Sequence, residues 1–236
     1  MSVKDHLNIF IPAYNEEESL SRIVELTVKA LRDEEISFTI LIGDDGSTDN
    51  TALIAQELTH RFSNVCFYSQ DRNYNLGFNF RHAIQEFKEG YFSWIPSDGE
   101  IDPKLLCELY KRRGENKVIY SAPSGSFQAR GALRTLISYL YQLVFRMTFN
   151  SKVIYFNGPS LYPLKKLKAL SLISEGFAIN AEMVLKMKKF NVEYEMVRYA
   201  LKPRSGGEAT ALSLSNMRMV FSSFMRLYKS IKGGSF

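Results

Sequence analysis

The chain has 236 residues, 45% of them hydrophobic, which is enough for one large domain or two small ones with a sizeable core. The net charge of +5 suits anionic partners such as nucleotides or lipid phosphates. Because the basic residues do not cluster in a recognisable nucleic-acid-binding module, we expect no nucleic acid partner. Cys66 and Cys107 lie in apolar segments, which indicates buried thiols rather than a disulfide or metal site.

Signals for entering or crossing a membrane are missing from the sequence. Residues 1–10 lack a charged region followed by an apolar core, so we expect no signal peptide. No apolar run approaches the roughly 20 residues that span a bilayer. We therefore expect a cytoplasmic protein that rests, at most, on the inner face of a membrane.

Strand-like and helix-like patterns alternate in the first half of the chain, residues 1–121. Short apolar runs predict the strands, and apolar residues at helical spacing predict the helices between them. Asn15 is expected to cap the first helix, and Ser47 or Asp49 the second. The predicted strands are 7–11, 38–42, 65–68, 91–95 and 118–121, and the predicted helices are 15–31, 51–62, 77–88 and 103–111. This alternation is typical of an α/β fold with a parallel, Rossmann-like sheet.

The second half is less regular, and a loop rich in small residues, 121–131, separates it from the first. We expect a single domain, 1–236, that ends in an amphipathic helix within 211–236. The patterns predict an apolar helix at 132–149, a turn-rich stretch at 157–163, a helix at 180–189, a strand at 194–200 and a terminal helix at 211–231.

The stretch YFSWIPSDGEIDP, residues 91–103, is a candidate ligand site. An aromatic strand ends at Pro96, which has no N–H to continue a ladder, and three carboxylates follow it. Open α/β sheets bind ligands beyond the carboxyl ends of their strands. The alternative is a polar loop in which Asp102 caps the next helix.

Several segments match a known pattern in order and spacing. IFIPAYNEEESL (9–20) and LIGDDGSTDNT (41–51) resemble the first two signatures of inverting family 2 glycosyltransferases. KPRSGGEAT (202–210) resembles a loop of polyprenyl- and dolichyl-phosphate sugar transferases, many of which carry C-terminal membrane helices that this sequence does not show. The resemblance covers nearly all of 7–210. It implies a GT-A type fold, a Rossmann-like, mainly parallel sheet flanked by helices, with extra C-terminal helices.

The resemblance implies an inverting glycosyltransferase that moves a sugar from a nucleotide-diphosphate donor to a lipid-phosphate or lipid-linked saccharide acceptor, in cell-surface polysaccharide or glycoconjugate synthesis. Residues 1–121 would form the donor half and 122–210 the acceptor half. Two alternatives remain open. One is transfer to a soluble or protein-linked acceptor sugar, and the other is a non-catalytic donor-binding subunit, which Pro96 in the acidic loop allows.

By the same resemblance, the loops after the first two strands hold the nucleoside of the donor. Glu16 would accept a hydrogen bond from ribose and Asp45 one from base or ribose, whereas Asp44 is expected to be structural. From the residues alone, Glu16 complements a helix dipole, Asp45 belongs to an Asx turn and Arg72 is a surface residue. The implied donor-binding residues are Pro12, Tyr14, Glu16, Asp45, Arg72 and Asp98.

A divalent cation, Mg²⁺ or Mn²⁺, is the implied cofactor, because the leaving nucleoside diphosphate is negatively charged. Members of the family hold it with an Asp-x-Asp motif. Aligned with that motif, Asp98 is the retained metal ligand and catalytic carboxylate, and Pro96 replaces the first aspartate. Glu100 is either a second ligand or a solvent-facing residue.

The acceptor side is implied to include Asn157, Asn180 and Glu182. A hydroxyl acceptor needs a general base, for which Glu182 is the candidate, whereas a lipid phosphate needs none. The alternative places Glu182 in the first turn of a helix that Asn180 caps. Arg204, with Lys202 as a second candidate, is implied to bind phosphate, since a guanidinium fork fits phosphate oxygens. The alternative for Arg204 is a mobile basic loop.

Between Lys202 and Lys232, six basic residues stand against one acidic residue, Glu208, with apolar side chains interleaved. Such a helix is typical of a membrane interface, and 132–149 offers a second apolar surface. Peripheral membrane contact is therefore a hypothesis. The alternative is that both helices pack on the domain or form a subunit contact. The sequence carries no signal for the oligomeric state.

Overall fold

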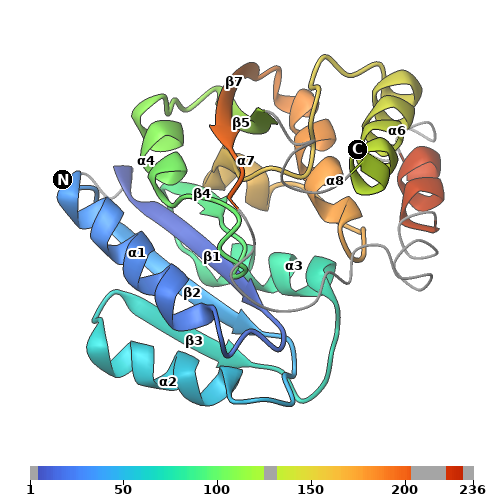
Figure 1. Ribbon diagram of the computed structural model, residues 1–236. Helices are drawn as coiled ribbons and strands as arrows, with labels where there is room; N and C mark the ends of the chain where they lie inside the picture. Colours follow the sequence, from blue (N-terminus) through green and yellow to red (C-terminus); the bar gives the residue numbers. More distant parts are fainter. Residues whose placement is uncertain (1–4, 125–131, 203–221, 231–236) are drawn as a thin grey trace.

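The computed structural model describes residues 5–124, 132–202 and 222–230 (Figure 1). Within them, a seven-stranded sheet has the order β3-β2-β1-β4-β6-β5-β7. All neighbouring pairs are parallel except those of β6, which is antiparallel to β4 and β5. The predicted α/β fold with a mainly parallel sheet is confirmed. The strands are β1 (Leu7–Ala13), β2 (Phe38–Asp44), β3 (Val65–Ser69), β4 (Tyr91–Trp94), β5 (Lys117–Ser124), β6 (Ser160–Pro163) and β7 (Glu193–Ala200).

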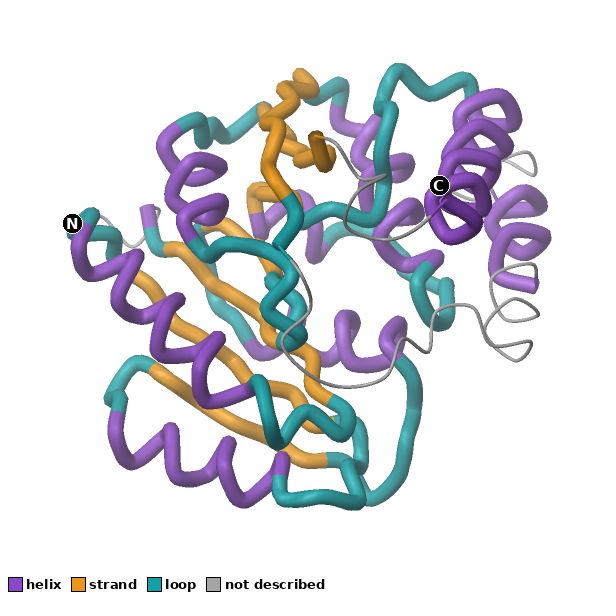
Figure 2. Tube along the Cα trace, in the orientation of Figure 1, coloured by secondary structure: helices purple, strands orange, loops and turns teal. Residues whose placement is uncertain are grey.

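Helices lie on both sides of the sheet (Figure 2). A 3-10 helix (Met187–Phe190) continues α8, and residues 222–230 form a further helix, which we call the terminal helix. The remaining helices are α1 (Leu20–Asp33), α2 (Thr51–Arg61), α3 (Leu76–Glu86), α4 (Lys104–Lys111), α6 (Ala132–Phe149), α7 (Leu164–Lys168) and α8 (Ala178–Lys186).

Side chains of β1 alternate between two apolar cores, one on each face of the sheet. Ile9 and Ile11 face the core that α1, α2 and α4 close, whereas Phe10 faces the core that α3 and α8 close. Phe10 packs edge-on against Phe80 of α3, with ring centroids 5.1 Å apart. Because both faces are covered, the central strands need the nearly continuous apolar runs from which the sequence predicts them.

Strand β6 is an element that the sequence pattern misses. It lies within the stretch predicted as turn-rich and pairs antiparallel with Tyr91 and Phe92 of β4. Gly158 and Pro159 before it are typical of a loop, and four residues are too few to show a period of two. The strand exists because β4 and β5 offer free edges on either side of it.

Three helix predictions need correction or restriction. α1 begins at Leu20, because Asn15 adopts a left-handed conformation, with φ 53°, that a helix cap does not have. α8 begins at Ala178, so Asn180 lies inside the helix and does not cap it. Of the terminal helix predicted at 211–231, residues 222–230 are helical, and 211–221 and 231 lie outside the described residues.

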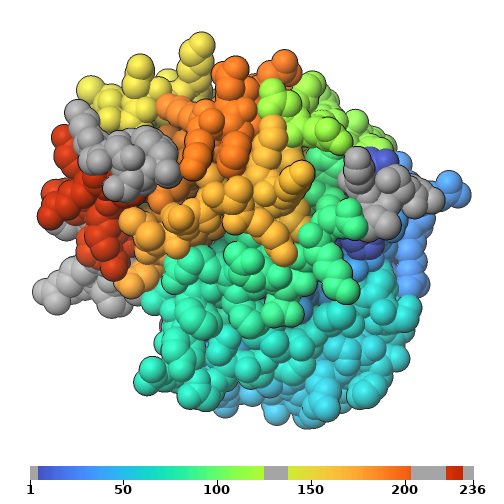
Figure 3. Space-filling view, turned by 180° about the vertical axis from the view of Figure 1, so that it is seen from behind, coloured from blue at the N-terminus to red at the C-terminus, as the bar shows by residue number. Residues whose placement is uncertain are grey.

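Gly77, at the start of α3, allows this helix to meet the segment that precedes α8. A Cβ atom at Gly77 would lie 2.2 Å from the carbonyl oxygen of Ser174 and 2.8 Å from the Cα of Glu175. In the view from behind, the orange surface of the second half lies directly against the teal surface of the first (Figure 3). The two halves of the chain therefore meet through their backbones at this point.

We predict that Gly77→Ala lowers the free energy of unfolding by about 1–3 kcal/mol, the usual cost of overpacking. Urea denaturation of the full chain measures this change. Gly114→Ala is the control, because a Cβ atom there meets the flexible side chain of Lys117, at 3.3 Å. Equal stability of the two variants would contradict the close backbone contact.

Candidate functional site

Three loops converge at the carboxyl ends of β1, β2 and β4, the edge where open α/β sheets bind ligands. The N–H of Asp45 donates to the carbonyl oxygen of Ala13 at 2.9 Å and ties the loop after β2 to β1. The hydroxyl of Ser97, after β4, donates to the carbonyl oxygen of Pro12 at 3.0 Å. Pro12 and Asp45 are thus brought together with the acidic loop that contains Asp98, as the resemblance implies.

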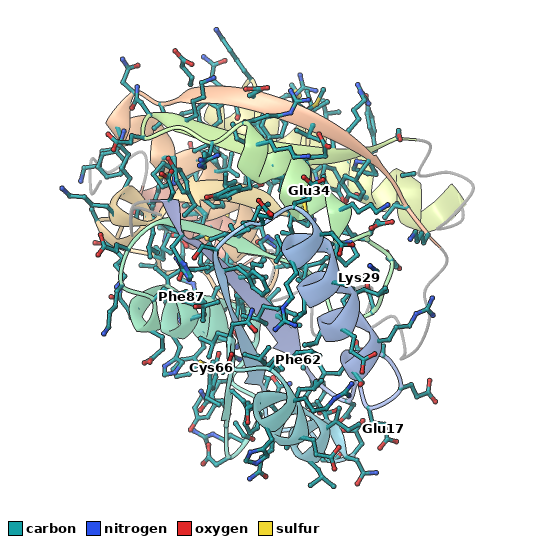
Figure 4. All side chains as sticks on the ribbon, turned by 90° about the vertical axis from the view of Figure 1, so that its left-hand side faces the viewer. Glu17, Lys29, Glu34, Phe62, Cys66 and Phe87 are labelled. Carbon is teal, nitrogen blue, oxygen red and sulfur yellow. The ribbon has the colours of Figure 1, made fainter. Side chains whose placement is uncertain are left out.

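The loops after β1 and β2 interlock through side chains that bind each other's backbone. Asn15 accepts from the N–H of Thr48 at 2.9 Å, and Glu17 accepts from the N–H of Asn50 at 3.0 Å. In return, Thr51 accepts from the N–H of Glu16 at 2.8 Å. Figure 4 shows Glu17 in the loop that precedes α1. Asn15 therefore holds the second loop in place instead of capping a helix.

Glu16 is buried at this junction. Its side chain is 9% exposed and accepts from the hydroxyl of Ser19 at 2.6 Å. Because α1 begins only at Leu20, Glu16 does not lie in the first turn of a helix, and the interpretation as a dipole partner is wrong. Tyr14 beside it is 43% exposed, as expected of a residue that faces a ligand or solvent.

The two neighbouring aspartates have different environments. Asp44 accepts from the N–H of Ser47 at 3.1 Å and from the hydroxyl of Ser69 at 2.7 Å, so its expected structural role is confirmed. Asp45 is 7% exposed and accepts from the N–H of Tyr74 at 2.8 Å. Burial raises the pKa of Asp45, although hydrogen bonds from Tyr74 and Asn79 oppose that rise. Asn79 lies on α3, where no sequence motif marks it.

The loop before α3 packs on the loop after β2. A Cβ atom at Gly46, which has φ 73°, would lie 2.5 Å from the carbonyl carbon of Arg72. The exposed guanidinium of Arg72 lies 4.8 Å from the centroid of the Tyr74 ring. Tyr74 in turn stacks on Phe78, at 4.8 Å between ring centroids. Arg72 is therefore an exposed residue at the rim of the donor side, held by a cation–π contact.

The acidic loop after β4 is more compact than the sequence suggests. Asp98 is half-buried and accepts from the N–H of Glu100 at 3.0 Å across Gly99, which has φ 72°. Glu100 is 5% exposed, so its interpretation as a solvent-facing residue is wrong. Among the described residues, no group of three or more His, Cys, Asp or Glu side chains is arranged to hold a metal ion.

The end of β7 reaches this acidic loop from the second half of the chain. Leu201 forms a β-bridge with Ile101, and the N–H of Lys202 donates to the carbonyl oxygen of Glu100 at 2.8 Å. The Lys202 ammonium lies 2.8 Å from the carboxylate of Asp102. Burial by itself raises the pKa of the Asp102 carboxyl, but hydrogen bonds from the Lys202 ammonium and from the N–H of Lys104 in α4 outweigh it. The pKa of Asp102 is therefore lowered. Arg204, two residues on, lies outside the described residues.

Glu182 faces the interior of the second half. Its side chain is fully buried, and its carboxylate lies 2.7 Å from the ammonium of Lys186. It also accepts from the N–H groups of Ile173, at 3.0 Å, and Ser174, at 2.7 Å. In this arrangement the carboxylate anchors the segment before α8 and does not face the loops of the donor side.

The other acceptor-side candidates have unpaired polar atoms. Asn180 is 1% exposed, and neither polar atom of its side chain has a hydrogen-bond partner among the residues that the structure describes. The buried side-chain oxygens of Asn157 and Ser174 also have none within that part of the chain. A buried polar atom without a partner costs about 1–3 kcal/mol, so such atoms need an explanation, and a polar ligand or water is one.

We predict that Glu182→Gln lowers the free energy of unfolding by about 3–5 kcal/mol, because it leaves the buried Lys186 ammonium without its counter-charge. Chemical denaturation measures the loss. Glu193→Gln is the control, since the Glu193 side chain is 73% exposed. A stable Glu182→Gln variant that loses only turnover would instead identify Glu182 as a general base.

Comparison with solved structures supports the fold assignment. Glucosyl-3-phosphoglycerate synthase from Mycobacterium tuberculosis, in complex with UDP, superposes with a TM-score of 0.71 at 15% identity and covers 94% of this chain and 80% of that chain. The same enzyme with Mn²⁺, UDP-glucose and phosphoglyceric acid gives 0.71 at 14% identity, over 94% and 79% of the two chains. The implied GT-A fold is therefore confirmed.

Comparison with curated sequences gives shorter matches. A dolichyl-phosphate beta-glucosyltransferase from Trichomonas vaginalis is 32% identical over 77 residues, 30% of this chain and 24% of that protein. An undecaprenyl-phosphate 4-deoxy-4-formamido-L-arabinose transferase from Proteus mirabilis is 38% identical over 69 residues, 29% and 21% of the two proteins. The matched stretches thus span a quarter or less of these relatives.

A family profile covers much more of the chain. Residues 8–170, which include β1 except its first residue, β2–β6 and the three converging loops, match the profile of glycosyl transferase family 2. This match confirms the resemblance that the two loop signatures indicate. The chain belongs to glycosyl transferase family 2.

Proposed function

We propose that the protein is an inverting glycosyltransferase that moves a sugar from a nucleotide-diphosphate donor to a phosphate carried by a lipid. Residues 1–121 would form the donor half and 122–210 the acceptor half. The observation that carries the proposal is that the segments proposed for the acceptor side offer no carboxylate without a cationic partner. The stretch 153–163 contains none, and the two in 170–186, Glu175 and Glu182, are both paired with cations.

The donor side supports the first part of the proposal. Asp45 and Glu16, both buried, provide acceptors for ribose or base hydrogen bonds, and Tyr14 offers an exposed ring beside them. Arg72, at the rim, is placed to meet the base or the diphosphate. Arg204, outside the described residues, is the first phosphate-binding candidate, and Lys202, which pairs with Asp102 beside the acidic loop, is the second.

A divalent cation fits the acidic loop only as a centre shared with the donor. Asp98 is one half-buried carboxylate, and Glu100 lies next to it. Mg²⁺ commonly takes one or two carboxylates and completes its shell with substrate phosphates and water. We propose Asp98 as its ligand, with Glu100 as a second. When bound, the ion would supply positive charge for the departing diphosphate. The solved neighbours bind Mn²⁺ together with UDP-glucose, or Mg²⁺ together with UDP.

The acceptor side favours an anionic nucleophile. A phosphate oxygen attacks the anomeric carbon from the face opposite the nucleoside diphosphate, the bond from that carbon to the diphosphate oxygen breaks, and the configuration inverts. The oxygen is already negative, so no proton has to be removed. The polar atoms of Asn157 and Asn180 that have no partner among the described residues provide hydrogen-bonding groups for such an acceptor. The relatives from Trichomonas vaginalis and Proteus mirabilis are named for dolichyl and undecaprenyl phosphate.

A lipid-linked acceptor also explains the exposed apolar face of α6. Its side chains Tyr139, Leu140, Val144 and Met147 are 61%, 50%, 48% and 75% exposed. No acidic residue occurs in α6 or in the terminal helix, and Arg146 and Lys229 are exposed on them. Such a surface fits the interface of an anionic membrane. Within the described residues, no helix combines the length and the apolarity that a bilayer crossing requires.

A soluble acceptor is the second candidate, and the neighbour bound to phosphoglyceric acid favours it. That acceptor also carries a phosphate, but its reacting group is a hydroxyl, which needs a base. Assays with one donor and two acceptors, a polyprenyl phosphate and 3-phosphoglycerate, distinguish the two cases. Transfer only to 3-phosphoglycerate would overturn the lipid proposal. Donor binding without any transfer would indicate a non-catalytic subunit.

We predict that Asp98→Ala reduces sugar transfer about a hundredfold or more. The variant lacks the proposed ligand of the divalent cation that would compensate the negative charge of the leaving diphosphate. Turnover of the donor, with Mg²⁺ or Mn²⁺ added, is the measurement. The thermal midpoint should stay within a few degrees of the parent. Asp33→Ala, on the exposed end of α1, is the control. Full turnover by Asp98→Ala would refute the assignment.

We predict that the double substitution Leu140→Glu and Met147→Glu reduces binding to vesicles of anionic phospholipid about tenfold or more, since two apolar side chains no longer enter the interface. A flotation assay at low salt measures it. Leu53→Glu is a matched control, because Leu53 is a 56% exposed leucine on α2. If the parent protein does not float, the membrane hypothesis fails.

A further inference from the structure

The segment Ile173–Gly176 belongs to the second half of the chain, contacts α3 of the first half, and is held from three directions. From α8, Glu182 accepts from the N–H groups of Ile173 and Ser174. From α3, Arg81 donates to the carbonyl oxygen of Ser174 at 2.6 Å. From the terminal helix, the fully buried hydroxyl of Ser223 lies 3.3 Å from both the N–H nitrogen and the carbonyl oxygen of Glu175. We call this segment the strap.

An ion pair completes the contact between the strap and the terminal helix. The two terminal nitrogens of Arg226 lie 2.7 and 3.3 Å from the two carboxylate oxygens of Glu175, a fork-to-fork arrangement. The hydrogen bond from Arg226 lowers the pKa of Glu175, so the pair is charged at neutral pH. The terminal helix is anchored in turn by Leu227, which is fully buried, and by Phe224, which contacts Phe145 of α6 at 5.0 Å between ring centroids.

The other side of the strap touches the donor site. The N–H of Gly176 donates to the side-chain oxygen of Asn75 at 3.3 Å. Asn75 has φ 69° and precedes α3, and its own N–H donates to the side-chain oxygen of Asn73 at 3.1 Å. The N–H of Tyr74, the residue before it, donates to the carboxylate of Asp45 at 2.8 Å. The contacts therefore run from Arg226 through the strap to Asn75, and from there through the Tyr74–Asn75 backbone to the carboxylate that we propose for the nucleoside.

We infer that Glu175 and Arg226 are positioning residues for the donor site: the pair seats the strap, and the strap fixes the Tyr74–Asn75 backbone that orients Asp45. The inference rests on the proposed function for Asp45, but the contacts themselves do not. The side chains of Arg226 and Glu175 are 46% and 42% exposed. Exposed pairs of this kind add little to global stability, so the main effect of the pair is on local geometry. Nothing in the sequence links position 226 with position 75.

The first test needs no ligand. In the full chain, Arg226→Gln is expected to speed hydrogen exchange of the amides of Tyr74 and Asn75 about fivefold, with an unchanged thermal midpoint. Arg226→Lys keeps the positive charge but cannot form the two parallel hydrogen bonds, so its exchange rates should lie between those of the parent and those of Arg226→Gln. Arg112→Gln is the matched control, because the Arg112–Glu195 pair has similar exposure, 46% and 35%, and joins the residue after α4 to β7.

The second test uses uridine and guanosine diphosphates with Mn²⁺ as probes and measures their dissociation constants by calorimetry. For whichever nucleotide binds the parent, Arg226→Gln and Glu175→Gln should each weaken binding about fivefold, and Arg112→Gln should not. If neither nucleotide binds the parent, the proposed function fails, and the exchange experiment alone decides the inference. The inference is overturned if the exchange rates do not change, if Arg112→Gln changes them equally, or if Arg226→Gln lowers the thermal midpoint more than Arg112→Gln does.

Discussion

The donor end of this protein depends on hydrogen bonds between the loops that follow β1 and β2. Each loop supplies side-chain oxygens to the other's backbone amides, as Asn15 does for Thr48 and Thr51 does for Glu16. Parallel pairing of β1 with β2 brings the two loops to one edge of the sheet. Because their amides are satisfied there, the loops can stay irregular and compact and still present carboxylates at fixed positions.

Burial gives those carboxylates different roles. The carboxylate of Asp44 accepts hydrogen bonds from Ser47 and Ser69, whereas the buried Asp45 is held by the loop before α3 and has a raised pKa. Asp98 sits across the edge in a tight turn of its own. The α/β sheet thus serves as a rigid support on which three short loops form one site, and the rest of the fold holds those loops in place.

The second half of the chain acts on that site through contacts rather than through a motif. β7 brings Lys202 to the acidic loop, and the strap brings Gly176 to Asn75. The buried Glu182 holds the strap and is neutralised by Lys186. In the described segment around α8, both carboxylates, Glu175 and Glu182, are paired with cations, which fits the proposed acceptor that arrives already charged.

The sequence by itself determined the alternation of strands and helices, the family signatures and the position of the acidic loop, because these depend on local apolar periodicity and short spacings. The tertiary structure alone decided what depends on distant partners. β6 exists only between two free strand edges, Asn15 binds a neighbouring loop instead of capping a helix, and Glu100 and Glu182 lie buried in the packed chain. Burial and hydrogen-bond partners are properties of the packed chain, and no local pattern records them.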